Sequence, residues 1–362
     1  MDQRKKNLKV SAPGRICLFG EHQDYLHLPV IPCAISLRIS IEGKRRDDLN
    51  IHLDLPDIGD RKSFSIEKEV PYFEERDYFR SAINILQRDQ LTFESGFDCT
   101  VQGNIPINSG TSSSSALVVA WIGFLARMSD QKVELTPEKI AEYAHRAEVL
   151  EFSEPGGMMD HYSSAIGGVG FLNFLPRITF ESIEADLKTF VLGDSGEPKD
   201  TKSILARVKN CVIDISESLT RKYADFSLHA LQLEELPKFA AELSKDKREL
   251  LEGTARNYRI TKEAKSVLKN HPLDHRKMGH LLNEHQRILR DILKISTPKI
   301  DRMLDAALAA GAYGGKINGS GGGGCMFVYA PENPHTIAEA VEKEGGKAYV
   351  ISVDQGITLT DF

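Results

Sequence analysis

The stretch Gly103–Leu117, GNIPINSGTSSSSAL, is a polar loop rich in glycine and serine that runs directly into the apolar segment Ala116–Ala126. Because that segment is apolar on every side, it predicts a buried helix. The first backbone N–H groups of a helix have no partner within it and carry partial positive charge, so such a start suits an anion. An ordinary helix cap or a linker is the plain alternative, but a flexible linker does not lead into a core.

The residue types of this loop fit phosphate binding. Glycine lets the backbone approach an anion closely. The four serines Ser112–Ser115 supply hydroxyls that can cap the helix, touch phosphate oxygens or reach a Mg²⁺ ion held by a nucleotide. The loop is not a P-loop, because the lysine of that motif is missing.

The composition is that of a globular protein, with 41% hydrophobic and 27% charged residues. A length of 362 residues suits two domains that share a cleft. A net charge of −6 argues against a nucleic-acid surface, and we interpret the basic run Lys44–Arg46 as a solvated hairpin turn. Five widely spaced cysteines and an N-terminus without an apolar signal core predict a cytoplasmic protein with reduced thiols and no membrane span.

Periodicity and turn residues predict the elements of the chain. We expect strands at Leu8–Ser11, Arg15–Phe19, Ile35–Glu42, Ile51–Leu55, Lys62–Ile66, Phe97–Gln102, Val169–Phe174, Phe190–Leu192, Cys211–Ile215, Met326–Tyr329 and Ala348–Val353. We expect helices at Tyr78–Gln90, Ala116–Ala126, Thr136–Glu151, Lys299–Ala310 and Thr336–Glu344, and a largely helical stretch over Leu228–Ile295. A glycine-dense loop is expected at Gly314–Cys325. This order predicts an α+β fold with domains at residues 1–185 and 186–362.

Polar groups gather beside predicted strand and helix ends in two further places: SAPGR followed by GEHQDY, which contain Arg15 and Asp24, and GMMD, which contains Asp160. Each alone has a plain alternative, such as an Asx cap or a surface ion pair. Together with the serine loop they fit phosphoryl transfer, which needs a helix start for the phosphates, a carboxylate for Mg²⁺ and an aspartate near the acceptor hydroxyl.

Three stretches, SAPGRICLFGEHQDY, PINSGTSSSSAL and KINGSGGGGC, resemble the three motifs of the GHMP kinase family in their usual order. The resemblance covers nearly the whole chain. Within the family, EHQDY, PVIPCAI and GMMDHYSSAIGG are similar to segments of galactokinases. The resemblance implies a two-domain GHMP kinase architecture with the active site in the cleft between the domains, and ATP and Mg²⁺ as cofactors.

The resemblance also assigns residues. It implies that Asp160 is the catalytic aspartate and that Arg15 lowers its pKa and stabilises transferred charge. It assigns sugar binding to Glu21, His22, Asp24 and Tyr25, and Mg²⁺ binding to Ser114 and Glu148. The nucleotide-binding residues that it implies are Asn108, Ser109, Gly110, Thr111, Ser112, Ser113, Ser114 and Ser115. From the residue pattern alone, Glu148 would be an ordinary surface helix residue.

Some positions depart from the galactokinase pattern. Gln23, His161 and Asn108 replace its usual threonine, glutamine and glycine, and residues 193–208 are more similar to mevalonate kinases. The Asp24-Tyr25 pair still favours a polyhydroxylated acceptor, so we expect a kinase that phosphorylates a monosaccharide at its anomeric hydroxyl, with galactose as the first candidate. A mevalonate-type or other GHMP kinase is the alternative, and a sugar sensor without turnover is a third. The expected partners are ATP and the small-molecule acceptor, with the chain a monomer or homodimer.

Overall fold

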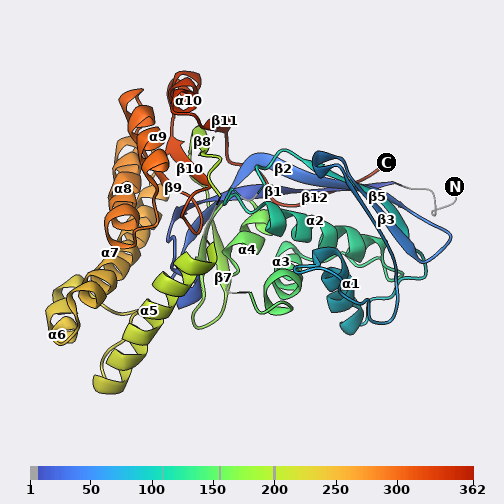
Figure 1. The fold of residues 1–362 in the computed structure, drawn as a ribbon, viewed down its shortest axis with the longest axis horizontal. Helices are drawn as coiled ribbons and strands as arrows, with labels where there is room; N and C mark the ends of the chain where they lie inside the picture. The colour runs from blue at the N-terminus through green and yellow to red at the C-terminus, as the bar shows by residue number, and fades with distance from the viewer. Residues whose placement is uncertain (1–6, 108, 155, 199–200) are drawn as a thin grey trace.

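The computed structural model describes residues 7–107, 109–154, 156–198 and 201–362 (Figure 1). Within them, eight strands form a large sheet in the order β12-β1-β2-β5-β3-β4, with β6 beside β2 and β7 beside β6. Its strands are β1 (Leu8–Phe19), β2 (Ile31–Arg45), β3 (Asn50–Leu55), β4 (Asp60–Ser65), β5 (Phe97–Gly103), β6 (Val169–Asn173), β7 (Thr179–Ile183) and β12 (Thr358–Asp361). Neighbouring strands are antiparallel except for β3 and β5.

A second, antiparallel sheet has the order β11-β8-β10-β9, and its strands are β8 (Phe190–Asp194), β9 (Gly314–Ile317), β10 (Cys325–Tyr329) and β11 (Lys347–Ile351). The helices that pack beneath the large sheet are α1 (Tyr78–Arg88), α2 (Ser113–Met128), α3 (Pro137–His145) and α4 (Met159–Ile166). The later helices are α5 (Thr201–Lys222), α6 (Leu236–Ala240), α7 (Lys245–Leu268), α8 (His275–Arg287), α9 (Pro298–Ala309) and α10 (Pro334–Lys343). This arrangement confirms the predicted α+β, two-domain class, while the boundary between residues 185 and 186 stays a prediction.

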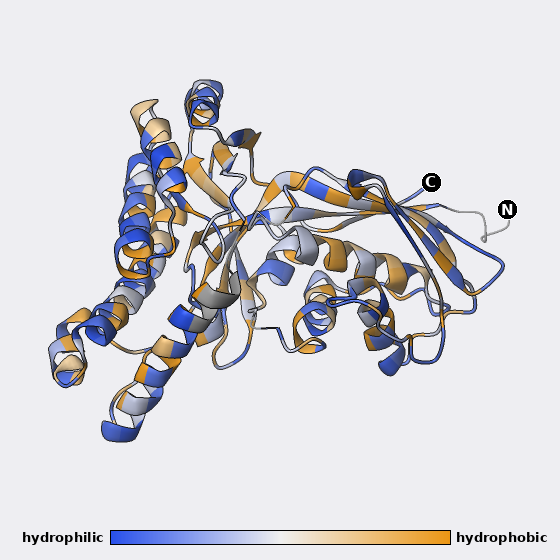
Figure 2. Ribbon diagram, in the orientation of Figure 1, coloured by the Kyte–Doolittle hydropathy of each residue, from blue (hydrophilic) through white to orange (hydrophobic). Residues whose placement is uncertain are grey.

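Helix α2 occupies the centre of the N-terminal part, as its uniformly apolar sequence predicts. It packs against β1 and β2 on one side and against α1, α3 and α4 on the others. Trp121 and Phe124 within it stack and are buried, and Figure 2 shows the helix as a mainly apolar ribbon. Since the core fixes the helix, its first turn is held rigidly at the end of the polar loop.

The predicted strand Cys211–Ile215 is wrong, because these residues lie in the middle of α5. Val208, Val212, Ile215 and Leu219 are all buried, and their spacing of three and four residues places them on one helix face. Three of them pack in a small second core with Leu26 and Leu28, which follow the first polar motif. A short apolar run can be strand or helix, and here tertiary packing decides.

Smaller corrections concern the strand ends. The two predicted strands before and after Pro13-Gly14 form one strand, β1, which bulges at this point. Lys44 and Arg45 belong to β2, so the basic run is not a hairpin turn, and Arg46 pairs with Asp48 and Asp98. The glycine-dense segment begins with a strand, β9, before it becomes a loop.

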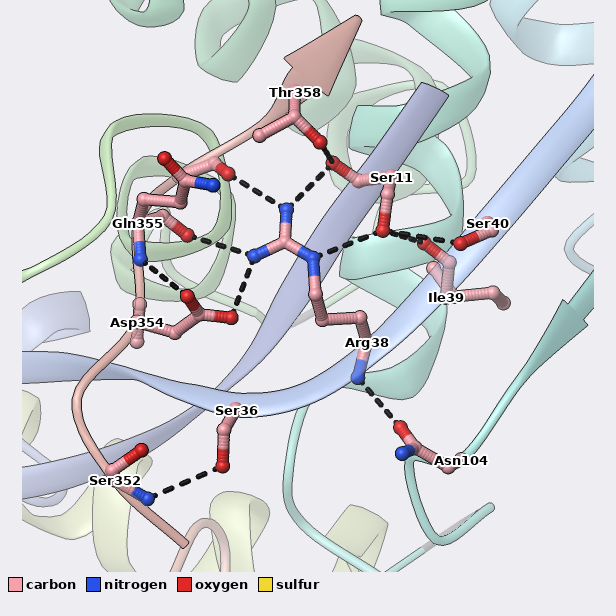
Figure 3. A network of polar contacts seen from close by, with 12 residues as sticks. Ser11, Ser36, Arg38, Ile39, Ser40, Asn104, Ser352, Asp354, Gln355 and Thr358 are labelled. Carbon is pink, nitrogen blue, oxygen red and sulfur yellow. Dashed lines mark hydrogen bonds and ion pairs between the residues drawn. The ribbon is translucent and has the colours of Figure 1, made fainter. Parts of the chain in front are cut away.

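The C-terminal segment returns to the N-terminal sheet, where β12 pairs with β1. Arg38 of β2 holds this C-terminal segment in place, and Figure 3 shows its guanidinium surrounded by hydrogen-bond acceptors. Its donors contact the Ser11 hydroxyl and carbonyl, the Asp354 carboxylate at 2.8 Å, and the carbonyls of Gln355 and Gly356. All five N–H groups of an arginine are thus used at one junction. No helix in the described ranges is both long and apolar enough to cross a bilayer.

Candidate active site

A pocket of about 970 Å³ opens where the end of β1 and the start of α2 meet the first turn of α4 and the glycine loop after β9. Every candidate site residue in the described part of the chain lines it, except Thr111. Ser320 and Pro198 line it from the C-terminal half, so residues of both halves contribute. The lining also includes several mainly apolar residues that the sequence did not reveal: Leu55, Ile58, Tyr78, Ile107 and Leu117.

The polar loop before α2 is anchored through the Gly110 carbonyl. That oxygen accepts hydrogen bonds from Arg15 Nη1 at 2.5 Å and from Asn318 Nδ2 at 2.8 Å. Gly110 and Ser112 have left-handed φ angles of 93° and 60°, which turn the chain into the helix at Ser113. The backbone N–H groups of the first turn of α2 therefore face a pocket held from both halves of the chain.

The loop residues divide into two groups. Ser109 and Thr111 are buried and their hydroxyls bond each other and the Pro106 carbonyl, so these side chains build the loop itself. Ser112, Ser113, Ser114 and Ser115 line the pocket. Asn108 lies outside the described residues.

Asp160, in the first turn of α4, is paired with Arg15. Arg15 Nε and Nη2 both lie 2.7 Å from Asp160 Oδ1. Burial would raise the pKa of Asp160, but the charge and hydrogen bonds of Arg15, with a contribution from Ser112, hold it below its ordinary value. Asp160 is therefore an anion at neutral pH that keeps its Oδ2 for other contacts.

Glu148 lies in a π-helical turn, η4 (Arg146–Leu150), which continues α3. It is buried, and its Oε2 lies 2.7 Å from Nε2 of His161. Burial alone would raise the pKa of Glu148, yet the hydrogen bonds from His161, Ser114 and Ser115 lower it. Single π turns inside helices recur at functional sites, and this one points Glu148 at the helix start that carries the serines.

The Ser114 hydroxyl and the Glu148 carboxylate are hard oxygen donors of the kind that Mg²⁺ takes. Among the described residues, no three His, Cys, Asp or Glu side chains form a cluster that could hold a metal alone. Mg²⁺ usually takes only one or two protein ligands and relies on nucleotide phosphates and water for the rest. The residues present therefore fit the ion that the sequence predicts.

The segment Glu21–Tyr25 is fixed mainly by the glycine loop. The Glu21 carboxylate accepts from Lys316 Nζ at 3.2 Å and from the Gly319 amide, and the Glu21 and Lys316 side chains are buried. His22 Nε2 donates to the Ser320 carbonyl at 3.1 Å, which leaves Nδ1 to accept from the Tyr25 hydroxyl. Burial lowers the pKa of His22 to about 4, so its ring is neutral. Lys316 was missed from the sequence, although it stands in the third motif.

Asp24 lines the same pocket as Glu21, His22 and Tyr25. Its Oδ1 accepts the Tyr25 amide. Burial and the neighbouring Asp160 raise the pKa of Asp24 to about 6. Gln23 points away from the pocket, toward the Thr261 hydroxyl of α7 at 3.3 Å. Gly157 touches Asp24 so closely that a Cβ there would lie 1.8 Å from Oδ2.

Family models, curated proteins and solved structures show what this chain is similar to. Models of the GHMP kinase N-terminal and C-terminal domains match residues 77–168 and 264–347, and the galactokinase galactose-binding signature matches residues 3–45. The mevalonate kinase of Thermococcus onnurineus is 32% identical and covers 97% of this chain and 98% of its own. The galactokinase of Haemophilus influenzae is 29% identical, and the match covers 99% of this chain and 97% of that galactokinase. A galactokinase structure from Lactococcus lactis, complexed with galactose, has a TM-score of 0.86 at 21% identity and covers 98% of this chain and 95% of its own.

The chain belongs to the GHMP kinase family, whose members are ATP-dependent phosphotransferases. Within that family it carries galactokinase-like features, namely the signature at its N-terminus and the likeness to galactokinases along its whole length. Mevalonate kinases are equally similar in sequence, so membership of the family does not by itself identify the acceptor substrate.

Proposed function

We propose that this protein transfers the γ-phosphoryl group of ATP, with Mg²⁺, to the anomeric hydroxyl of a monosaccharide, and that galactose is the first acceptor to test. Phosphotransfer is the activity of the family. The galactose-binding signature over residues 3–45 supports a sugar as the acceptor.

The observation that carries the proposal is Asp24. At the acceptor end, Arg15 is paired with Asp160 and Lys316 with Glu21, so these charges largely cancel. Asp24 adds a further carboxylate, and burial together with the neighbouring Asp160 already raises its pKa to about 6. A neutral polyol gives such a group hydrogen-bond donors, whereas mevalonate brings a carboxylate of its own and would be repelled. Asp24 therefore favours a polyhydroxylated, uncharged acceptor.

In this proposal the acceptor hydroxyl hydrogen-bonds to Asp160 while its oxygen attacks the γ-phosphorus and the bond to the ADP oxygen breaks. Because its pKa is low, Asp160 is a weak base, so we infer that it orients the hydroxyl and takes its proton late, as the new bond forms. Arg15 holds Asp160 in place and stabilises charge. The first turn of α2 holds the phosphates, and Ser114 and Glu148 hold Mg²⁺, which supplies charge neutralisation.

The alternative is a mevalonate-type kinase. The specific observation for it is the 30–32% identity to archaeal mevalonate kinases over nearly the whole chain. It uses the same phosphate loop, Asp160 and Arg15, so only the acceptor separates the two.

The test is ADP release with Mg·ATP and galactose, arabinose, glucose, fucose, N-acetylgalactosamine, galacturonate or mevalonate. Turnover on a neutral sugar supports the proposal, and release of phosphate from the product by mild acid identifies a sugar 1-phosphate. Turnover on mevalonate alone overturns it. Tight ATP binding without turnover on any of them also contradicts it and favours a sensor.

A further inference from the structure

We propose that His161 is a positioning residue that fixes the Glu148 carboxylate for binding of the nucleotide's cation. The inference rests on the proposed role of Glu148 as a Mg²⁺ ligand. The residue pattern of the sequence assigns no role to His161.

His161 and Glu148 form a buried hydrogen bond. His161 Nε2 and Glu148 Oε2 are 2.7 Å apart, and both side chains are almost completely buried, with 2% and 10% of their surface exposed. A buried carboxylate without a hydrogen bond would turn toward any donor or take up a proton. One oxygen of Glu148 is thus held by a buried ring, and Ser114 and Ser115 of α2 are its other hydrogen-bonding neighbours.

The other nitrogen of the His161 ring, Nδ1, is buried and makes no competing hydrogen bond among the described residues. The ring of His145 packs edge-on against it, with centroids 5.4 Å apart. Because Glu148 Oε2 accepts and Nδ1 has no partner, the ring makes a single side-chain hydrogen bond with the described residues, in which Nε2 donates to Glu148. This bond orients the carboxylate.

His161 is the chain neighbour of Asp160, the proposed catalytic aspartate. It follows Asp160 directly in the first turn of α4, so neighbouring side chains serve the two ends of the reaction. Asp160 faces Arg15 and the acceptor, and His161 faces Glu148 and the serine loop. The backbone between them sets the separation of acceptor and cation sites, which phosphoryl transfer requires to be fixed.

The experiment measures nucleotide binding by calorimetry with a non-hydrolysable ATP analogue, with and without Mg²⁺. For His161→Leu we expect the Mg²⁺-dependent gain in affinity to fall about 10- to 100-fold, as for other outer-shell partners of metal ligands, with metal-free affinity unchanged. His161→Gln, whose amide can reach Glu148, should keep most of the gain. His145→Leu is the matched control, because it removes a buried neighbouring ring that makes no hydrogen bond to Glu148, and it should keep the gain.

Glu148→Gln distinguishes the role of Glu148 as a Mg²⁺ ligand from the role of His161 in positioning it. If it leaves the Mg²⁺-dependent gain intact, Glu148 is not a ligand and the proposed function of this residue fails. If Glu148→Gln loses the gain but His161→Leu keeps it, the inference about His161 alone is overturned. Should His161→Leu not fold, His161→Asn replaces it: an asparagine is too short to reach Glu148, so an affinity equal to that of His161→Gln would overturn the inference.

Discussion

Arg15 and Asp160, 145 residues apart in the chain, meet at 2.7 Å on the wall of the pocket, and the same guanidinium holds the Gly110 carbonyl of the phosphate loop. The pair therefore ties the acceptor end to the phosphate end. It also determines the chemistry of Asp160, whose pKa is held low by Arg15.

The first prediction concerns Asp160→Asn. The amide keeps the size of the side chain but can neither pair ionically with Arg15 nor accept a proton. We expect kcat to fall about 10²- to 10⁴-fold, while the dissociation constant of the ATP analogue stays within a factor of about three, because Arg15 and Asn318 keep their hydrogen bonds to the Gly110 carbonyl of the phosphate loop. Steady-state kinetics and calorimetry measure the two quantities. Near-normal kcat would show that Asp160 is not the group that receives the hydroxyl.

The second prediction uses the raised pKa of Asp24. With a pKa of about 6 in the folded protein and about 4 in the unfolded chain, the folded state binds more protons between these values. The free energy of unfolding therefore falls as pH rises from 4 to 6, and above pH 6 the full penalty remains. Asp24→Asn cannot ionise and should be more stable than the wild type at pH 7.5, by on the order of 1–3 kcal/mol.

Denaturant unfolding at pH 7.5 and pH 4.5 checks this, and the advantage should shrink at the lower pH. The variant should also lose acceptor affinity, seen as a raised KM for the sugar. Parallel stability curves for the two proteins would mean that Asp24 carries no such penalty.

The third prediction concerns Gly157→Ala. Its Cβ would lie 1.8 Å from Asp24 Oδ2 and 2.4 Å from Cγ, so Asp24 must move. We expect KM for the acceptor to rise about tenfold or more, because hydrogen bonds to a displaced carboxylate are lost, and nucleotide affinity to stay unchanged. Gly156→Ala is the control, since its Cβ would meet only Val149 methyl groups, at 3.3 and 3.9 Å. Equal effects of the two variants would rule out a specific contact with Asp24.

Local patterns explain which parts of the fold could be predicted. The helix after the serine loop was predictable because a wholly apolar segment of this length has few alternatives, and the structure starts α2 at Ser113. The strand predicted at Cys211–Ile215 failed because four apolar residues in five suit either element. Only the buried series from Val208 to Leu219, spread over several turns, identifies the helix.

The site was predictable where a motif is contiguous and not where a partner is remote. The loops with Arg15, Asp24 and Asp160 stand out in the sequence, but no local pattern says that Lys316 pairs with Glu21 from 295 residues away. His161 stands where the galactokinase pattern usually has glutamine, yet its contact with Glu148 depends on how α3, its π turn and α4 pack. Such contacts follow from tertiary structure alone.

The last prediction concerns Arg38, which holds the C-terminal segment to β1 and β2 (Figure 3). Arg38→Met keeps the length of the side chain but leaves the Asp354 carboxylate and several carbonyls without their donor. We expect the free energy of unfolding to fall by roughly 2–4 kcal/mol and amide exchange to rise over residues 352–361. Arg45→Met is the control, because Arg45 donates to Ser95 and to carbonyls at the end of α2, away from this segment. Both variants should lose stability, but only Arg38→Met should speed exchange in the C-terminal segment; unchanged exchange there would mean that the pairing of β12 with β1 suffices to hold it.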